Sequence, residues 1–381
     1  MTIMVTTLVD RITLVPALGI VVSRVLLATV KGLFQAEEHN VSYRDYVFAS
    51  VLRGLFTVLT IGQLQYVNPL PTVSSYLHLF HLRLLFKPFI DSYKAYCKKN
   101  QLQPIVEDIP NTDIKGFWLG SKDSAQYSMV FYHGGGFVLP GLPLHVDMLA
   151  RWVEWSNGRL AIFCPCYTLA PEGVYPLQIA QSVEALRHVL SLPHRSPESV
   201  LLGGDSAGGN LVLAVLSHVS GHPHPQDQIV RPLEIPAPLK GAITIAPWVS
   251  TDDTKFKSMQ QLADIDCVNS TSGRYWIAAY RGSGVDDQYI APELASPGWW
   301  SGCRVSSFLT TTGNCEFLRD SVVDTARKVQ QGAKHVDFKL VVAPGELHDA
   351  PLTPKPSGLL DQLGDACQEG AIRKWIKSRL L

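Results

Sequence analysis

The fold is decided by the stretch VLLGGDSAGGNLVLAVL, which runs from residue 200 to residue 216. Its apolar start predicts a buried strand, the small residues around Ser206 allow a sharp turn, and the apolar run after Asn210 predicts a helix. A nucleophilic serine needs this context, because the turn exposes its hydroxyl at the end of the strand and the positive end of the helix dipole points at it. Ser206 is therefore our candidate nucleophile; the alternative is an ordinary glycine turn.

A glycine-rich motif lies upstream of this turn. The sequence His133-Gly-Gly-Gly-Phe137 follows residues 128–132, an apolar stretch that predicts another buried strand. Three glycines let the backbone approach a reacting carbonyl group, so that N–H groups can bind the oxyanion that develops on it. The expected donors are the N–H groups of Gly134, Gly135, Gly136 and Ala207. The histidine of the motif is expected to organise the loop by hydrogen bonding rather than to act as the base.

A catalytic base should come late in the chain, because acid and histidine follow the serine in this type of site. His348 follows a predicted strand at residues 338–342, as a terminal histidine loop should. Most of the other histidines precede Ser206, lie in the region 222–224, or stand at the wrong end of a strand, as His335 does. His348 is therefore the candidate base, with a surface histidine as the alternative.

Two carboxylates are candidates for the acid that orients the base. Glu316 follows a predicted strand that ends near residue 311, and Asp320 lies one helical turn further on. A carboxylate at either position would select the imidazole tautomer and stabilise the imidazolium. The residues alone leave both open.

Short apolar strands alternate with helical segments from about residue 104 onward. The predicted strands are residues 113–120, 127–132, 159–165, 199–204, 241–246, 305–312 and 336–342. The predicted helices include 178–191 and 210–220, and the Pro- and His-rich run 222–238 is predicted to be a surface loop. This alternation is typical of an α/β fold with a mostly parallel central sheet covered by helices on both faces, whose sites form at the carboxyl ends of the strands.

The N-terminal part of the chain has a different character. Residues 1–103 predict helices with apolar stripes, for example at 75–98, and no strand. We therefore expect a helical cap or lid at 1–103 and a catalytic domain at 104–381. The cap is expected to fold onto the core and to line the substrate pocket.

The motifs resemble those of the hormone-sensitive-lipase-like esterases, a family with the α/β-hydrolase fold that includes bacterial acetyl-hydrolases and many fungal biosynthetic-cluster hydrolases. Residues 133–136 match its HGGG motif, and residues 204–209 match its GDSAGG motif. Looser matches are YTLAPE at 167–172 with the Tyr-Pro at 175–176, the Pro-Trp at 247–248, and EFLRD at 316–320. The resemblance covers the chain from about residue 105 onward and implies the α/β-hydrolase fold.

Carried over residue by residue, the resemblance also implies roles. It makes Ser206 the nucleophile, His348 the base and Glu316 the acid, with oxyanion donors on the loop 134–136 and on Ala207. Glu316 departs from the family, which usually has the shorter aspartate there. Thr168 also departs, because it replaces the usual arginine. The N-terminal segment of the family usually forms a cap over the site.

Composition limits the partners that the chain can bind. Lys+Arg and Asp+Glu are balanced at 33 each, 46% of the residues are hydrophobic and 17% are charged. No basic surplus can neutralise phosphates, so nucleic acid is not an expected partner. The seven cysteines are irregularly spaced, which predicts reduced thiols in an intracellular protein rather than a disulfide framework.

The apolar run at residues 12–30 is interrupted by Pro16, Gly19 and Arg24. A charge at mid-span costs about 2.5–3.5 kcal/mol on insertion scales, which argues against a clean transmembrane helix. No basic region precedes the run, as one would in a signal peptide. We expect a helix packed on the protein; the alternative is association with an intracellular membrane through residues 12–30.

These features predict a serine hydrolase that cleaves a carboxylic ester by acyl transfer to water, without a metal or an organic cofactor. By analogy with the family, the expected substrate is a hydrophobic small-molecule ester, such as a short acyl ester of a secondary metabolite. Two alternatives stay open. One is transacylation or lactone formation by the same three residues, and the other is a non-catalytic ligand-binding module.

Overall fold

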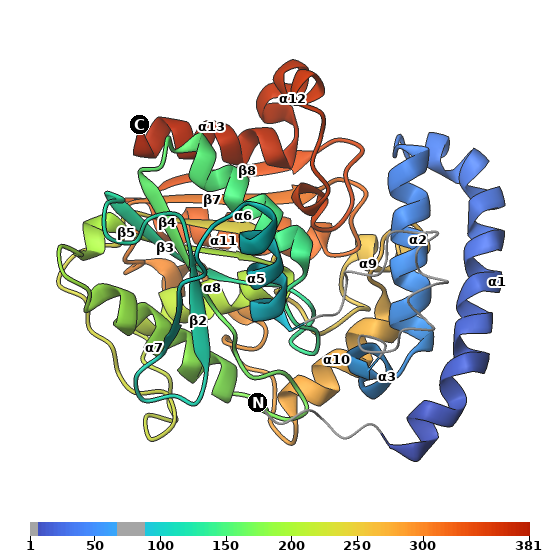
Figure 1. The fold of residues 1–381 in the computed structure, drawn as a ribbon, viewed down its shortest axis with the longest axis horizontal. Coiled ribbons are helices and arrows are strands. Elements are labelled where there is room, and N and C mark those ends of the chain that lie inside the picture. Colours follow the sequence, from blue (N-terminus) through green and yellow to red (C-terminus); the bar gives the residue numbers. More distant parts are fainter. Residues whose placement is uncertain (1–6, 67–87) are drawn as a thin grey trace.

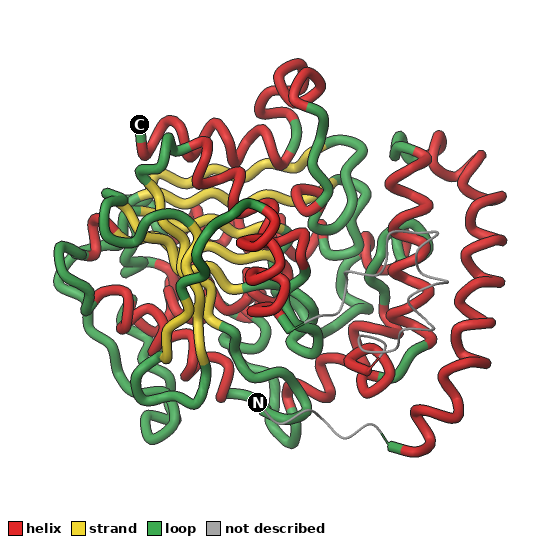
Figure 2. Tube along the Cα trace, viewed as in Figure 1, coloured by secondary structure: helices red, strands yellow, loops and turns green. Residues whose placement is uncertain are grey.

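The computed structural model describes residues 7–66 and 88–381. A central sheet with the strand order β1-β2-β4-β3-β5-β6-β7-β8 dominates this part of the chain (Figures 1 and 2). The strands are β1 (Val106–Asp108), β2 (Lys115–Leu119), β3 (Tyr127–Tyr132), β4 (Leu160–Pro165), β5 (Val200–Asp205), β6 (Gly241–Ile245), β7 (Ser307–Gly313) and β8 (Asp337–Ala343). β2 pairs antiparallel with β1 and β4, and all other neighbours pair in parallel. The predicted mostly parallel sheet is confirmed.

The predicted strands agree with the observed ones to within two residues at each end. Two differences remain. The short strand β1 was not expected, and it extends the sheet only by pairing with β2. The helix after the turn begins at Ser206 itself, four residues earlier than its apolar run suggests, because the small residues of the turn are already helical.

Helices cover both faces of the sheet (Figure 1). Side chains of one parity, such as Met129 and Phe131, pack with α5 (Phe89–Lys99), α6 (Pro143–Trp155) and α13 (Gln368–Leu380). Side chains of the other parity, such as Val130 and Tyr132, pack with α7 (Leu177–Leu190), α8 (Ser206–Val219) and α11 (Arg319–Gly332). Helices α9 (Lys257–Gln261), α10 (Ser270–Arg281) and α12 (Ser357–Leu363) lie in the connections. Alternation along each strand thus creates two apolar layers.

The N-terminal helices α1 (Leu8–Glu38), α2 (Tyr43–Val58) and α3 (Ile61–Tyr66) stand beside the sheet, with α1 outermost (Figure 1). The predicted helix at 75–98 falls largely outside the described residues, and its described part lies in α5. Helix α5 packs on the sheet, where the Tyr93 ring stacks on Phe117 with centroids 4.3 Å apart. The predicted boundary at residue 103 stays a prediction.

Helix α1 is apolar but mostly exposed. It buries Leu14, Val21, Val25, Gly32 and Ala36, largely against α2. Arg24, the charge within the apolar run, donates a hydrogen bond from Nη1 to Thr57 Oγ1 of α2 at 3.1 Å. Among the described helices, α1 is the one that is long and apolar enough to cross a membrane. In its most apolar 18-residue stretch, 22% of the residues are buried.

Candidate active site

Ser206 stands at the junction of β5 and α8, with a backbone φ of +49°. That left-handed conformation is costly for a residue with a side chain and persists only when the surroundings impose it. Here the turn is closed from both sides: a Cβ at Gly204 would collide with the backbone of Gly208, and a Cβ at Gly208 would collide with the carbonyl oxygen of Tyr132. The glycines of the motif are therefore required by close backbone contacts.

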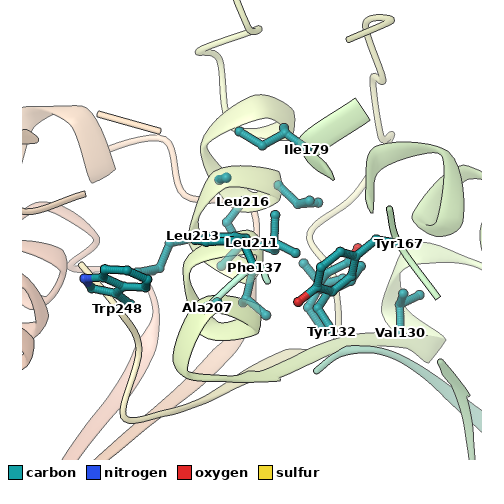
Figure 3. Packing of buried hydrophobic residues seen from close by; sticks show 14 of the residues in the cluster. Val130, Tyr132, Phe137, Tyr167, Ile179, Ala207, Leu211, Leu213, Leu216 and Trp248 are labelled. Atoms are coloured by element: carbon teal, nitrogen blue, oxygen red, sulfur yellow. The ribbon is translucent and has the colours of Figure 1, made fainter. Parts of the chain in front are cut away.

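Helix α8 holds the turn in place. Every residue from Ser206 to Val219 is buried. Leu211, Leu213 and Leu216 pack among aromatic side chains that include Phe137 and Tyr132 (Figure 3). Because the N–H groups of the first helical turn have no intrahelical acceptor, the Ala207 N–H stays available beside the serine hydroxyl.

His348 lies between the candidate nucleophile and a buried carboxylate. Its Nε2 lies 2.9 Å from Ser206 Oγ, and its Nδ1 lies 3.0 Å from Glu316 Oε1. Glu316 is fully buried and its other oxygen accepts hydrogen bonds from Thr312 Oγ1 (2.7 Å) and from the Gly313 N–H (2.9 Å). Both oxygens of the carboxylate are thus held, and the imidazole is oriented with Nε2 toward the serine.

Asp320, the alternative acid, forms hydrogen bonds away from His348. Its carboxylate accepts hydrogen bonds from the Ser258 N–H (2.9 Å) and from Arg319 Nε (2.8 Å). The structure therefore brings Glu316, and not Asp320, to the histidine.

A buried carboxylate that the sequence analysis missed joins the two loops that carry the acid and the base. Asp266 accepts backbone N–H bonds from Phe317 (2.7 Å), Cys267 (2.7 Å) and His348 (3.1 Å). The backbone of Phe317, the residue after Glu316, and the backbone of His348 are thereby bound to the same side chain. No motif surrounds Asp266 in the sequence, so only the three-dimensional structure shows that it contacts both loops.

The glycine loop is held by Asp205, the residue before the nucleophile. Asp205 Oδ1 accepts the Gly134 N–H at 3.0 Å, and Oδ2 lies 2.9 Å from His145 Nε2. Because His145 Nδ1 accepts a hydrogen bond from the Leu142 N–H (2.9 Å), Nε2 carries the proton and donates it to Asp205. Burial raises the pKa of Asp205, but His145 and the Gly134 N–H outweigh it and hold that pKa below its ordinary value.

This contact corrects one predicted oxyanion donor. The Gly134 N–H is committed to Asp205, so Gly134 supports the loop instead of facing the substrate. Gly135 and Gly136 line the pocket with Ser206, and their φ values of +111° and +60° suit glycine. Gly135, Gly136 and Ala207 remain the candidate donors.

His133, at the start of the loop, is buried away from the nucleophile. Tyr167 Oη donates a hydrogen bond to its carbonyl oxygen at 2.8 Å, and the two rings stack 4.3 Å apart. Burial lowers the pKa of His133 to about 4, so its ring is neutral. Its environment is that of a structural side chain.

Carboxylates dominate the electrostatics around the base. Burial disfavours the imidazolium, but the carboxylates of Asp349, Glu316 and Asp266 outweigh it and raise the pKa of His348 to about 10. Burial also raises the pKa of Asp266 to about 6. His348 and Asp266 therefore keep their protons to a higher pH than they would in isolation.

An apolar pocket lies against Ser206 and His348. Its apolar lining comes from α2 and from loops of the sheet domain: Phe48, Leu52, Phe56, Leu139, Leu142, Leu144, Val268, Trp276, Leu347 and Leu352. The expectation that N-terminal helices line the pocket therefore holds for α2. The pocket suits a ligand whose bulk is hydrophobic.

Comparisons with known proteins agree with this architecture. Residues 129–352, more than half of the chain, match the family model described as alpha/beta hydrolase fold. Carboxylesterase NlhH from Mycobacterium tuberculosis is 39% identical over 123 residues, which cover 31% of this chain and 37% of that protein. Steryl acetyl hydrolase 1 from Saccharomyces cerevisiae is 27% identical over 233 residues, covering 56% of this chain and 51% of that protein. The chain thus spans about a third to a half of the length of these curated relatives.

Solved structures share the fold over a larger part of the chain. A hormone-sensitive lipase from a metagenome library has a TM-score of 0.60 at 20% identity, covering 81% of this chain and 98% of that chain. A thermostable esterase from Pseudomonas putida also has a TM-score of 0.60 at 20% identity, with coverages of 87% and 97%. At this identity the likeness concerns the fold.

Proposed function

Because this chain belongs to the alpha/beta hydrolase fold family, we propose that it is a serine hydrolase that cleaves carboxylic esters. The observation that carries the proposal is the hydrogen-bonded series Ser206–His348–Glu316 beside an apolar pocket. The names of curated relatives, among them a carboxylesterase and a steryl acetyl hydrolase, support the same reaction class.

The proposed reaction proceeds by acyl transfer in two halves. His348 Nε2 takes the proton of Ser206 Oγ as the hydroxyl attacks the ester carbonyl, and the N–H groups of Gly135, Gly136 and Ala207 bind the oxyanion. The imidazolium, stabilised by Glu316, then protonates the leaving alcohol. Water, deprotonated by the same nitrogen, releases the acid.

The proposed substrate is an ester of a hydrophobic small molecule with a short acyl group, such as a secondary metabolite. The apolar side chains from α2 and the surrounding loops support a bulky hydrophobic portion. The name of the yeast relative, a steryl acetyl hydrolase, supports an acetyl ester of a large alcohol.

A fluorophosphonate probe tests the proposal, because it phosphonylates only an activated serine. We expect stoichiometric labelling at Ser206, located by peptide mass spectrometry, together with hydrolysis of p-nitrophenyl acetate. The folded Ser206→Ala variant should lose both. Turnover of the ester without labelling at Ser206 would contradict the proposal.

A further inference from the structure

Asp349 directly follows the base and lines the same pocket, yet the reaction described above gives it no task. Its Oδ2 lies 3.2 Å from His348 Nε2, and its side chain is 11% exposed. Its backbone φ is +51°, in the left-handed region that residues with side chains seldom adopt. Aspartate tolerates this region better than most residues, but strain of this kind gathers at functional sites.

Asp349 differs from the other carboxylates near His348 in its hydrogen bonds. Glu316 accepts bonds from Thr312 and Gly313, and Asp266 accepts three backbone N–H bonds. Asp349 Oδ1 is buried and has no hydrogen-bond partner within residues 7–66 and 88–381. A buried polar atom without a partner is energetically unfavourable, so a group from outside the described residues is expected to supply one.

The position of the carboxyl group indicates which part of a substrate it meets. His348 Nε2 must come within about 3 Å of the leaving oxygen to protonate it. Asp349 Oδ2 lies 3.2 Å from the same nitrogen. The first atoms of the alcohol portion therefore pass within contact of Asp349.

We propose that Asp349 is a specificity-determining residue that binds a second hydroxyl of the substrate alcohol, next to the ester oxygen. The preferred substrates are then monoesters of hydrophobic diols. This inference rests on the proposed function and narrows its substrate class. An alcohol without this hydroxyl leaves Asp349 Oδ1 without a partner in a pocket whose lining includes Leu142, Leu144 and Leu347.

Both protonation states of Asp349 suit this task. Burial and the nearby carboxylates raise the pKa of Asp349 well above its ordinary value, although His348 opposes them. As a carboxylate the side chain accepts a hydrogen bond from a hydroxyl group, and as a carboxylic acid it can also donate one to a hydroxyl oxygen.

Two esters that differ by one hydroxyl test the inference. The monoacetate of cyclohexane-1,2-diol and cyclohexyl acetate share the ring and the acyl group. We expect the full-length protein to favour the diol monoacetate by about tenfold in kcat/KM, the size of one net hydrogen bond. In Asp349→Ala the two values should come within about twofold of each other.

Two further variants keep the test decisive. Asp349→Asn retains hydrogen-bonding groups and tolerates a positive φ, so it should keep most of the preference. Asp349→Gly fits the backbone and lacks the side chain, so it should lose the preference even if the alanine variant folds poorly. Fluorophosphonate labelling of Ser206 reports an intact site in each variant.

The outcomes separate the inference from the proposed function. A wild-type ratio near one, or a ratio that survives in Asp349→Ala and Asp349→Gly, overturns the inference while the esterase activity stands. Equal changes for both esters, with a shifted pH profile, assign Asp349 to the imidazole and also overturn it. No labelling and no turnover of either ester overturn the proposed function and the inference together.

Discussion

Helices α8 and α1 are both apolar along their length, but they occupy opposite environments. All residues of α8 are buried, and its first residue is the candidate nucleophile. Helix α1 is longer, buries five residues and exposes large side chains such as Leu26, Leu33 and Phe34. Composition predicts that both segments form helices, but only the elements that pack around them decide whether an apolar side chain supports a site or faces outward. Substitutions should separate the two regions sharply.

The largest effect is expected where α8 begins. Ser206→Ala should reduce kcat for ester hydrolysis by about 10⁶-fold, because loss of the nucleophile removes the covalent route. Steady-state hydrolysis of p-nitrophenyl acetate measures this, and circular dichroism confirms that the variant is folded. Retention of a tenth of the wild-type rate would show that α8 supports the fold and not the reaction.

The next effect concerns the acid that reaches the base from the end of β7. Glu316→Gln should lower kcat by about 10⁴-fold, because an amide cannot stabilise the imidazolium. Asp320→Asn is the matched control, since Asp320 bonds to Ser258 and Arg319 instead. Its kcat should change far less, and the reverse ranking would transfer the acid role to Asp320.

The pH profile should reflect the carboxylates around the base. Only the neutral imidazole can accept the serine proton, and a raised pKa keeps the imidazolium to higher pH. Because the surrounding carboxylates raise the pKa of His348 to about 10 against burial, the acid limb of kcat/KM should lie above the ordinary histidine value of 6.5. A limb at or below that value would mean that those carboxylates are neutral in the free enzyme.

The smallest effects compare the two helices directly. Leu211→Ala in α8 should lower the free energy of unfolding by about 2–5 kcal/mol, because it leaves a cavity in the core. Leu26→Ala, at a position 64% exposed in α1, should change it by no more than about 0.5 kcal/mol. Urea denaturation measures both. Similar losses would indicate that the outer face of α1 is covered in solution.

Local motifs allowed much of the candidate site to be predicted. The candidate nucleophile, the candidate base and the glycine loop follow strand ends at which chemistry restricts the residue type, so a single sequence points to them. The exposure of α1 could not be predicted, because its pattern equals that of a buried helix. Asp266 and His145 escaped prediction for another reason: each acts through contacts to residues distant in the sequence, and neither stands in a motif.

Gly134 shows what a sequence motif cannot predict. The sequence indicates which glycines are close to the reacting atoms, but hydrogen bonds decide which N–H groups remain free. Asp205 takes the first of them, an assignment that depends on side-chain geometry within a buried turn. The choice between Glu316 and Asp320 likewise needed the structure or the family resemblance, since both follow the same strand.

The strand order places the two halves of the site at unequal distances from the edge of the sheet. Tyr132 and Gly204 are register partners on β3 and β5, so the glycine loop and the nucleophile leave adjacent central strands. Glu316 and His348 follow β7 and β8, and β8 is an edge strand that pairs only with β7 within the described sheet. Backbone amides of β8 should exchange their hydrogens for deuterium sooner than those of β5, because edge strands open locally at lower free energy. A brief opening at this edge would move His348 away from Ser206 and leave the serine and the oxyanion-binding N–H groups in place. Heat or denaturant should therefore abolish catalysis before the central strands unfold.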